Sequence, residues 1–440
     1  MATERTMATQ ERAKARIPGL TQLLSKRPDR FSMGVWPAYY SKAKGAEVWD
    51  LDGNKYLDMS IGGIGATVLG YADPDVDAAV IKAIHGGVAS SLNCPEEVDL
   101  AERLCGLHPW ADMVRYTRAG GEAMTVAVRI ARAKTGRDVV AFCGYHGWHD
   151  WYLAANVGTE NALGEHLIAG LDPAGVPRGL AGTALPFNYN RLDELEAIVA
   201  AHGKDLAAIV MEPIRNFDPD PAFIAGVERL ARETGAVWIL DEISAGFRFR
   251  AGGAHVVLYP QHTPDMAVFS KALGNGYPIS AIIGTAEVMD AAQHTFISST
   301  NWTERTGLAA ALATIDKYEA NNVQDHLNKL GGMVQEGWRE AGTRHGLALH
   351  AGGMKAMSHF AFEHPDARFL KAYYVQLMLD RGILASDLFY AMFAHTDADV
   401  DRYLAATDEA FAEIARALEA GNLNAQLRGE PSLVGFKRLA

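Results

Sequence analysis

The sequence predicts an α/β fold: a large domain around a mostly parallel sheet, and a smaller α+β domain made from both ends of the chain. Two observations predict it. From about residue 98, short apolar runs alternate with helix-like segments, which is typical of a parallel sheet covered on both faces. After about residue 305, long helical stretches enclose two short apolar segments. We therefore expect residues 76–320 to form the large domain, and 1–75 with 321–440 to form the small one.

The individual elements follow from periodicity and turn residues. We expect strands of the large domain at 113–117, 139–144, 206–212, 237–242, 266–270 and 279–284. Helices are expected at 121–135, 223–235, 305–320, 323–345, 367–382 and 397–418, with further strands around 347–361 and 383–394. The stretch EVWDLDGNKYLDM (47–59) predicts a hairpin that turns at Asp52-Gly53.

Composition excludes several classes of protein. The 53 acidic against 41 basic residues give a net charge of −12, which argues against nucleic acid or an anionic membrane as the main partner. No apolar run approaches the roughly 20 residues of a membrane span. The N-terminal stretch lacks the apolar region of a secretory signal, and we expect its first ten residues to fray. Three cysteines without metal-ligand spacing fit the reducing cytoplasm and indicate neither a disulfide framework nor a zinc site.

Unusual residues follow three of the predicted strands, at the sheet edge where ligands bind in such folds. In TRAGGEAM (117–124), Gly120 and Gly121 open a helix, which suits either an anion site or a plain turn. Asp241 and Glu242 end an apolar strand, where they serve either as caps or in function. Lys271 lies between apolar runs in VFSKALGNGYPISAIIG (268–284), although lysine is rarely buried.

These three features together match pyridoxal 5′-phosphate. That cofactor needs an anion site for its phosphate, an acid opposite its ring nitrogen, and an amine that holds its aldehyde as a Schiff base. Apolar surroundings favour the neutral, nucleophilic amine of a lysine. The sequence therefore predicts Lys271 as the Schiff-base residue.

The chain also resembles the class III pyridoxal-phosphate-dependent aminotransferases of fold-type I, and is most similar to their glutamate-1-semialdehyde aminomutase branch. The resemblance covers about residues 30–420. It depends on an ordered set of motifs, namely WDLDGNKYLDM, VLGYADPDV, GGEAMTVAVRIARAKTGRD, GYHGWHDW, VMEP, LDEISAGFR and FSKALGNGYP. It implies a seven-stranded type of sheet and a homodimer with shared active sites.

The resemblance also implies roles for single residues. Lys271 matches the Schiff-base lysine, and Asp241 matches the aspartate that pairs with the pyridine nitrogen. The other cofactor-binding residues that it implies are Ile243 and Tyr145 on the two faces of the ring, Gly120 and Gly121 in the phosphate cradle, and Thr300 from the neighbouring subunit.

The sequence departs from the family at three points. The cradle usually reads Ser-Gly-Thr-Glu-Ala, whereas this chain has Ala119-Gly120-Gly121-Glu122-Ala123 and lacks both hydroxyls. Arg118 stands where asparagine is frequent, and it could supply charge to the phosphate, bind a substrate carboxylate, or pair with an acid. Tyr390 stands where the aminomutase branch has a glutamate, which argues against true aminomutase activity.

Other residues have two readings. The histidines of YHGWHD, His146 and His149, lack a set of further ligands at metal spacing, so we expect packing or supporting roles and no metal. The aromatic cluster VWPAYY contains Trp36, Tyr39 and Tyr40, which belong either to the core or to the substrate site.

The sequence thus predicts a cytoplasmic, homodimeric aminotransferase. It would move an amino group from an amine or amino-acid donor to an aldehyde or keto acceptor by ping-pong kinetics, with Lys271 as general acid–base. The alternatives are an aminomutase-type isomerase, an aminotransferase for a sugar-derived keto substrate, and a cofactor-binding protein without turnover. The substrate itself is not predicted.

Overall fold

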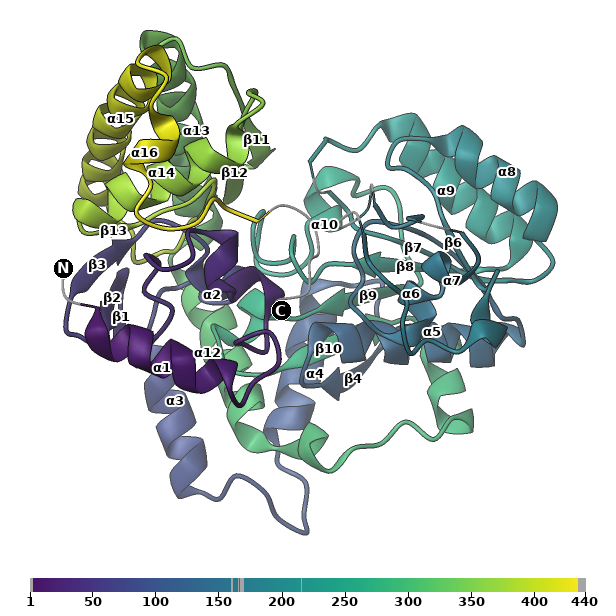
Figure 1. Cartoon of the computed structure of the whole chain (residues 1–440). Coiled ribbons are helices and arrows are strands. Elements are labelled where there is room, and N and C mark those ends of the chain that lie inside the picture. The colour runs from purple at the N-terminus through teal and green to yellow at the C-terminus, as the bar shows by residue number, and fades with distance from the viewer. Residues whose placement is uncertain (1–2, 160, 165, 167–169, 215, 434–440) are drawn as a thin grey trace. The chain divides into compact units, whose positions relative to one another are not determined.

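The computed structural model describes residues 3–159, 161–164, 166, 170–214 and 216–433. The chain divides into two compact units. The first unit contains residues 1–73 and 325–440, and the second contains residues 74–324. Each unit is described by itself (Figure 1).

The second unit is built on a seven-stranded sheet in the order β4-β10-β9-β8-β7-β5-β6. Its strands are β4 (Met113–Thr117), β5 (Val139–Cys143), β6 (Ala184–Pro186), β7 (Leu206–Met211), β8 (Val237–Asp241), β9 (Met266–Phe269) and β10 (Ser280–Gly284). The strands β5 to β9 pair in parallel, while β10 runs antiparallel to both β4 and β9. The predicted fold class is therefore confirmed, and each of the six expected strands is present; β6, three residues at the sheet edge, was not predicted.

Helices lie against this sheet, which explains why five of its strands are buried along their whole length. Every residue of β5, β7, β8, β9 and β10 is buried. Helix α5 (Gly120–Thr135) contacts five of the strands, and α8 (Leu192–His202) and α9 (Pro221–Thr234) pack side by side (Figure 1). Asp220 caps the start of α9, accepting a hydrogen bond from the backbone N–H of Ala222, and the left-handed Gly235 ends it.

The remaining elements of the second unit are shorter or lie outside the sheet. They are the helices α3 (Pro74–His85), α4 (Glu96–Leu107), α6 (Asp150–Leu153), α7 (Ala155–Gly158), α10 (His255–Leu258), α11 (Ala286–Met289) and α12 (Arg305–Ala320), and the 3₁₀ helices η3 (Arg178–Leu180), η4 (Lys271–Gly274), η5 (Asp290–His294) and η6 (Thr300–Thr303).

The first unit contains two small sheets, in the orders β1-β2-β3-β13 and β11-β12-β14. The strands are β1 (Tyr40–Lys44), β2 (Glu47–Asp50), β3 (Lys55–Asp58), β11 (Leu349–Met354), β12 (Met357–Phe362), β13 (Ile383–Leu384) and β14 (Leu388–Tyr390). The helices are α1 (Glu4–Lys14), α2 (Gly62–Gly65), α14 (Ala367–Asp380), α15 (Asp397–Glu419) and α16 (Leu423–Gln426), with η1 (Leu24–Lys26) and η2 (Pro28–Arg30); α13 (Val323–Arg344) begins at the end of the second unit.

The two ends of the chain are joined within the first unit. Strand β13 pairs in parallel with β3, and this pairing places Ile383 beside Leu57. Near the C-terminus, the backbone N–H of Leu433 donates to the carbonyl of Asp29 at 2.7 Å, and that of Glu430 donates to Met33 at 3.0 Å. Residues 430–433 therefore fasten the segment 29–33.

One local expectation was wrong. The first residues do not fray from residue 4 onward, because they form α1 and this helix is anchored to the predicted hairpin. The Asp52 carboxylate, in the turn between β2 and β3, accepts hydrogen bonds from the backbone N–H of Arg5 at 2.8 Å and of Thr6 at 3.0 Å, and from the Thr6 hydroxyl at 2.8 Å. A side chain 46 residues away thus caps a helix that local pattern alone did not indicate.

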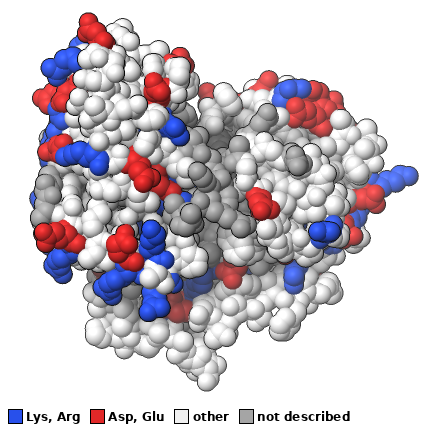
Figure 2. Space-filling view, viewed as in Figure 1, with Lys and Arg blue, Asp and Glu red and all other residues white. Residues whose placement is uncertain are grey.

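On the face shown in Figure 2, acidic and basic side chains are interspersed. Among the described residues, none of the helices has the length and apolar content that crossing a membrane requires. The same residues contain no cluster of His, Cys, Asp and Glu that could hold a metal ion.

Candidate active site

The candidate active site lies in the second unit, at the edge of the sheet where the parallel strands end. Strand pairing places Asp241, the last residue of β8, beside Val268 of β9, and Lys271 follows the end of β9. The loop after β5 carries Tyr145 and His146, and β5 runs parallel to β7 and β8. The predicted residues of these three strand ends therefore belong to one edge of one sheet.

Asp241 is a buried carboxylate with two hydrogen bonds. Only 3% of the residue is exposed. Its Oδ1 accepts the backbone N–H of Ile243 at 3.0 Å, and its Oδ2 lies 2.8 Å from Nδ1 of His146. A buried carboxylate without partners would be strongly unfavourable, so these two groups stabilise its charge.

His146 holds this carboxylate in place through both nitrogens of its ring. Its Nε2 lies 3.0 Å from the carbonyl oxygen of Cys143, which can only accept, so Nε2 carries a hydrogen. Its Nδ1 faces the Asp241 carboxylate, so the two ring nitrogens join this carboxylate to the backbone at the end of β5. The sequence led us to expect a packing or supporting role for His146, and the contact with Asp241 is such a role.

Lys271 begins the 3₁₀ helix η4 in the left-handed backbone region, with φ of +46°. This conformation is uncommon for a residue with a side chain and is typical of functional sites. Its neighbours Phe269, Ala272 and Leu273 are fully buried, while Lys271 itself is half-buried. Its Nζ donates to the hydroxyl of Ser244 at 2.6 Å. Because Ser244 follows β8, this bond ties the ends of β8 and β9 together.

The N-terminus of α5 forms a cradle of bare backbone. A Cβ on Gly120 would come 2.8 Å from Cδ1 of Ile243, and a Cβ on Gly147 would come 2.9 Å from Cα of Gly121. Larger residues at these two positions would therefore displace their neighbours. Ala119, the N-cap, has no side-chain hydrogen bond to the helix, so the N–H groups of the first turn are left for another acceptor.

Tyr145 lies in the loop after β5, at the same edge of the sheet as Asp241 and Lys271. Its backbone N–H donates to Oε2 of Glu212 at 3.2 Å, and its ring contacts that of Tyr152 edge-on, with centroids 6.0 Å apart. The Tyr152 hydroxyl in turn donates to the carbonyl of Gly144 at 2.9 Å. These contacts hold the loop that carries both Tyr145 and His146.

Arg118 is committed to the segment after residue 300. Its guanidinium donates to the carbonyls of Pro278 at 3.3 Å, Asn301 at 2.5 Å, Trp302 at 3.2 Å, and Glu304, and it also pairs with the Glu304 carboxylate at 3.8 Å. Of the three roles considered, this geometry corresponds to pairing with an acid.

Thr300 is exposed at the start of η6. No contact of Thr300 with Gly120, Asp241 or Lys271 is among the hydrogen bonds of the described residues. Its predicted role in the site of a neighbouring subunit stays a prediction.

The aromatic residues considered for the substrate lie in the first unit. Trp36 stacks on Phe31, with ring centroids 3.9 Å apart, and belongs to a hydrophobic cluster of that unit. Tyr39 is half-buried and Tyr40 is 65% exposed. The core reading therefore fits Trp36, and a substrate role for the three residues stays a prediction.

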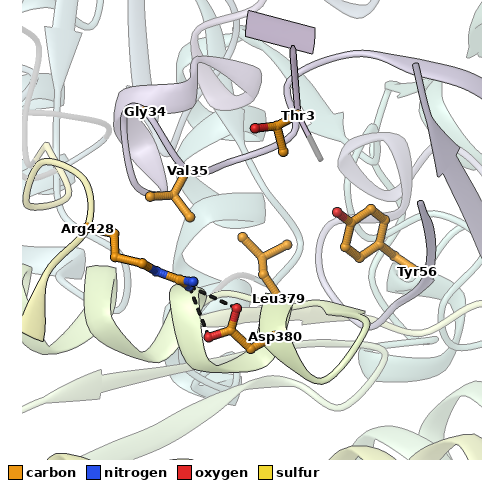
Figure 3. Close-up of a pocket in the computed structure, with 7 residues that line it drawn as sticks. All are labelled: Thr3, Gly34, Val35, Tyr56, Leu379, Asp380 and Arg428. Carbon is orange, nitrogen blue, oxygen red and sulfur yellow. Dashed lines mark hydrogen bonds and ion pairs between the residues drawn. The ribbon is translucent and has the colours of Figure 1, made fainter. Parts of the chain in front are cut away.

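The first unit also has a small cavity of about 190 Å³ (Figure 3). Two of the residues drawn there, Arg428 and Asp380, are ion-paired at 3.0 Å, so their charges neutralise each other. The titratable and nucleophilic groups of the candidate site lie in the second unit, whereas this cavity is lined by residues of the first unit.

Sequence reasoning missed two residues of the site. Ser244 gave no signal, because nothing in the sequence places its hydroxyl next to Lys271. For His149 the sequence predicted a packing or supporting role without naming a partner, and its imidazole lies beside the glycine cradle of α5: a Cβ on Gly121 would come 3.3 Å from its Cδ2. The missing hydroxyls of the cradle were the sequence signal that could have indicated a substitute nearby.

Comparisons with known proteins show which family the whole chain resembles. The family model "Aminotransferase class-III" matches residues 31–400. The chain is 32% identical to 3-aminobutyryl-CoA aminotransferase of Cloacimonas acidaminovorans, over 94% of this chain and 98% of that enzyme. It is 33% identical to glutamate-1-semialdehyde 2,1-aminomutase of Symbiobacterium thermophilum, with the same coverage of 94% and 98%.

A solved structure is similar over almost the whole chain. The FumI protein of Sphingopyxis sp. MTA144, in its PLP internal aldimine form, superposes with a TM-score of 0.84 and 26% identity. The match covers 98% of this chain and 99% of that one.

Proposed function

Because the chain belongs to the class III aminotransferases, whose cofactor is pyridoxal 5′-phosphate, we propose that it transfers an amino group from an amine or amino-acid donor to an aldehyde or keto acceptor by a ping-pong mechanism. The observation that carries this proposal is the convergence of Lys271 and Asp241. Both follow neighbouring parallel strands, and the carboxylate of one and the amine of the other meet the requirements of that cofactor.

The described residues fit the cofactor. The bare N-terminal turn of α5 offers N–H groups and a positive dipole for the phosphate. Asp241 supplies the negative charge for a protonated ring nitrogen, and Ile243 lies against Gly120 at the cradle. When bound, the cofactor supplies an electron sink for the carbon that exchanges its proton.

The residues of the chain then have separate tasks. His146 holds the Asp241 carboxylate in a fixed orientation. Lys271 carries the proton at its Nζ, and the Ser244 hydroxyl, 2.6 Å away, positions that amine. Half-burial of Lys271 among fully buried neighbours limits the access of water to the amine.

The lysine is tested directly. Borohydride reduction of the cofactor-loaded protein should fix the cofactor to the peptide that contains Lys271. Lys271→Ala should remain folded, lose the visible absorbance band of lysine-bound cofactor, and lose multiple turnover, because no amine remains to carry the proton. Peptide mapping by mass spectrometry checks the attachment, and a label on another lysine would overturn the assignment.

The second candidate is an aminomutase-type isomerase. It is favoured by the 33% identity to a glutamate-1-semialdehyde aminomutase, which is no lower than that to the aminotransferase. Tyr390, in β14, argues against an isomerase, because the resemblance to the aminomutase branch implies a glutamate at this position. Conversion of one semialdehyde without a second substrate would support the isomerase, whereas bleaching of the cofactor band by an added amine supports the aminotransferase. The alternative of a sugar-derived keto substrate is tested by adding such a compound as the acceptor in the aminotransferase assay.

We also propose that the enzyme is a homodimer with shared active sites. Support comes from apolar side chains that the second unit exposes: Leu92 at 82%, Phe296 at 91% and Val98 at 59%. Val98 also lines a groove of about 490 Å³ together with Ser299 and Trp302, and the exposed Thr300 follows Ser299 in the chain. Exposed apolar surface of this kind is typical of an interface.

The dimer is tested by sedimentation of apo and cofactor-loaded protein. Phe296→Asp should yield monomers, because it places a charge in an apolar contact. Thr300→Ala should weaken cofactor binding by about ten- to a hundredfold while the dimer persists, because one hydrogen bond to a charged group is lost. A cofactor-loaded monomer whose affinity is insensitive to Thr300 would contradict the shared site.

A further inference from the structure

His149 lies against the N-terminal turn of α5. The edge of its ring that carries Cδ2 and Nε2 faces Gly121: a Cβ at that position would come 3.3 Å from Cδ2 and 3.5 Å from Nε2. The close approach of Gly147 to Gly121 brings the loop there, since a Cβ on Gly147 would come 2.9 Å from Cα of Gly121. The absence of a side chain at Gly121 therefore leaves the space that the His149 ring occupies.

This turn needs a donor that its own side chains do not supply. Ala119, Gly120 and Gly121 carry no hydroxyl or charge. Glu122 is turned away from the turn: its Oε2 accepts the backbone N–H of Arg118 at 2.9 Å, and its Oε1 accepts the indole N–H of Trp302 at 3.0 Å. A phosphate at this helix end would meet backbone N–H groups alone unless another residue contributes.

Arg118, the nearest cation in sequence, is occupied. Its three guanidinium nitrogens donate to four backbone carbonyls of residues 278–304. Burial lowers the pKa of this arginine, although nearby acids oppose the shift. Reaching a phosphate would require breaking this set of bonds, so Arg118 supports the segment after residue 300 and does not supply the missing donor.

His149, in contrast, has a donor to offer. Among the described residues, no hydrogen bond uses its ring nitrogens, and its one ring contact is with Trp148, whose centroid lies 4.5 Å away. Burial lowers the pKa of His149, while Glu122 and Asp150 oppose the shift. Burial thus disfavours the charged form of the ring, and, because no protein acceptor fixes its tautomer, its hydrogen can reside on Nε2.

We propose that His149 binds the cofactor phosphate through Nε2–H, in place of a hydroxyl at position 121. The inference depends on the proposed function, since it concerns the phosphate of the same cofactor. It assigns to His149 a part of the cofactor site and explains how a cradle of alanine and two glycines can retain an anion. The dianion would accept from the imidazole together with the N–H groups of the first turn.

The test compares two ligands on the apoprotein: pyridoxal 5′-phosphate, and pyridoxal, which lacks the phosphate. His149→Ala should weaken the binding of the first by about ten- to a hundredfold, because a hydrogen bond to a charged acceptor is lost. Binding of pyridoxal should not change. His149→Gln, whose amide N–H can reach the same place, should recover part of the affinity. The control is His202→Ala in α8, which should bind both ligands as the wild type does.

A double variant sharpens the test. In His149→Ala the space beside residue 121 is empty, and Gly121 has a helical backbone that accepts a side chain. His149→Ala/Gly121→Ser should therefore regain about tenfold of the lost phosphate-dependent affinity, since serine places a hydroxyl at the helix end. Failure of both Gln and this serine to restore affinity would overturn the proposal, as would an equal loss for pyridoxal.

Inorganic phosphate separates this inference from the proposed function. Inorganic phosphate binds without a bond to lysine, and it should compete with the cofactor for the phosphate site of the apoprotein. If inorganic phosphate inhibits cofactor binding more weakly in His149→Ala than in the wild type, the inference is supported. It is supported even if borohydride labels no lysine, because a missing label would overturn only the proposed function. An unchanged inhibition constant in His149→Ala overturns the inference, whatever Lys271 does.

Discussion

Asp241 and Glu242 are neighbours at the end of β8, yet their carboxylates differ in the number and the origin of their hydrogen-bond donors. Glu242 is fully buried and accepts three hydrogen bonds from one segment: the backbone N–H groups of Ala254 and His255, each at 3.0 Å, and Nδ1–H of His255 at 2.6 Å. Asp241 accepts one backbone N–H and one bond from His146, which comes from a distant loop. Successive side chains of a strand point to opposite faces, so the two acids serve different sides of β8.

Two histidines, His255 and His108, belong to the surroundings of Glu242. The indole of Trp110 donates to Nε2 of His255 at 3.1 Å, which leaves the hydrogen of that ring on Nδ1, toward Glu242. His108 accepts the backbone N–H of Gly253 at 2.8 Å and donates to the carbonyl of Leu104. All these groups are bound within the protein, so Glu242 anchors residues 253–255, whereas Asp241 faces the site.

The largest effect is expected from Asp241→Asn. Asparagine keeps the size of the side chain and the bond from Ile243, but it has no charge for His146 or for the cofactor nitrogen. We expect the transamination rate to fall by about a thousandfold, which corresponds to about 4 kcal/mol. The free energy of unfolding should change little. Rate measurements beside urea unfolding check both, and a variant with near wild-type rate would show that another group sets the charge at the ring.

The reverse result is expected for Glu242→Gln. The amide nitrogen would face the N–H groups of residues 254 and 255 and leave one of them without an acceptor. We expect the free energy of unfolding to fall by about 3 kcal/mol, while the folded protein retains its cofactor affinity. Urea titration and a cofactor titration measure the two quantities. A loss of affinity without a loss of stability would remove the distinction between the two acids.

A smaller effect is expected for His108, through pH. Burial lowers the pKa of His108 from 6.5 to about 4. Between pH 6.5 and pH 4, His108 is therefore protonated in the unfolded chain but not in the folded protein. The contribution of His108 to stability is present above pH 6.5 and is lost as the pH falls toward 4. Between pH 7 and pH 5 this loss is about 2 kcal/mol.

The variant His108→Gln isolates this contribution. Glutamine can still donate to Leu104 and accept from Gly253, but it does not titrate. Its stability should fall less than that of the wild type between pH 7 and pH 5, by about the same 2 kcal/mol. Urea unfolding of both proteins at the two pH values provides the measurement, and parallel pH curves would refute the assignment.

The contrast between neighbouring residues also indicates what sequence can predict. Strands β5, β7, β8, β9 and β10 were predictable because each is buried along its whole length and so is largely apolar, whereas the short, partly exposed β6 was not. Asp241 and Lys271 were predictable because each interrupts such a run with a charge, and the resemblance assigned them matching roles.

Contacts between distant segments were not predictable. The commitment of Arg118 to carbonyls at 301–304, the hydroxyl of Ser244 beside Lys271 and the edge of His149 beside Gly121 depend on how loops approach one another in space. Helix α1 was missed for the same reason, since its cap is Asp52. Local pattern carries no information on such partners.

The pairing of β3 with β13 has a consequence for how the protein is made. Strand β3 leaves the ribosome early, but its partner Ile383 follows only after the whole second unit has been synthesised. At ordinary elongation rates this delay is about 15–60 s, in which residues 74–324 can fold while the N-terminal segment waits with an unpaired strand edge. The second unit can therefore fold before the unit that joins both ends of the chain, and a nascent chain stalled before residue 383 would expose the unpaired edge of β3.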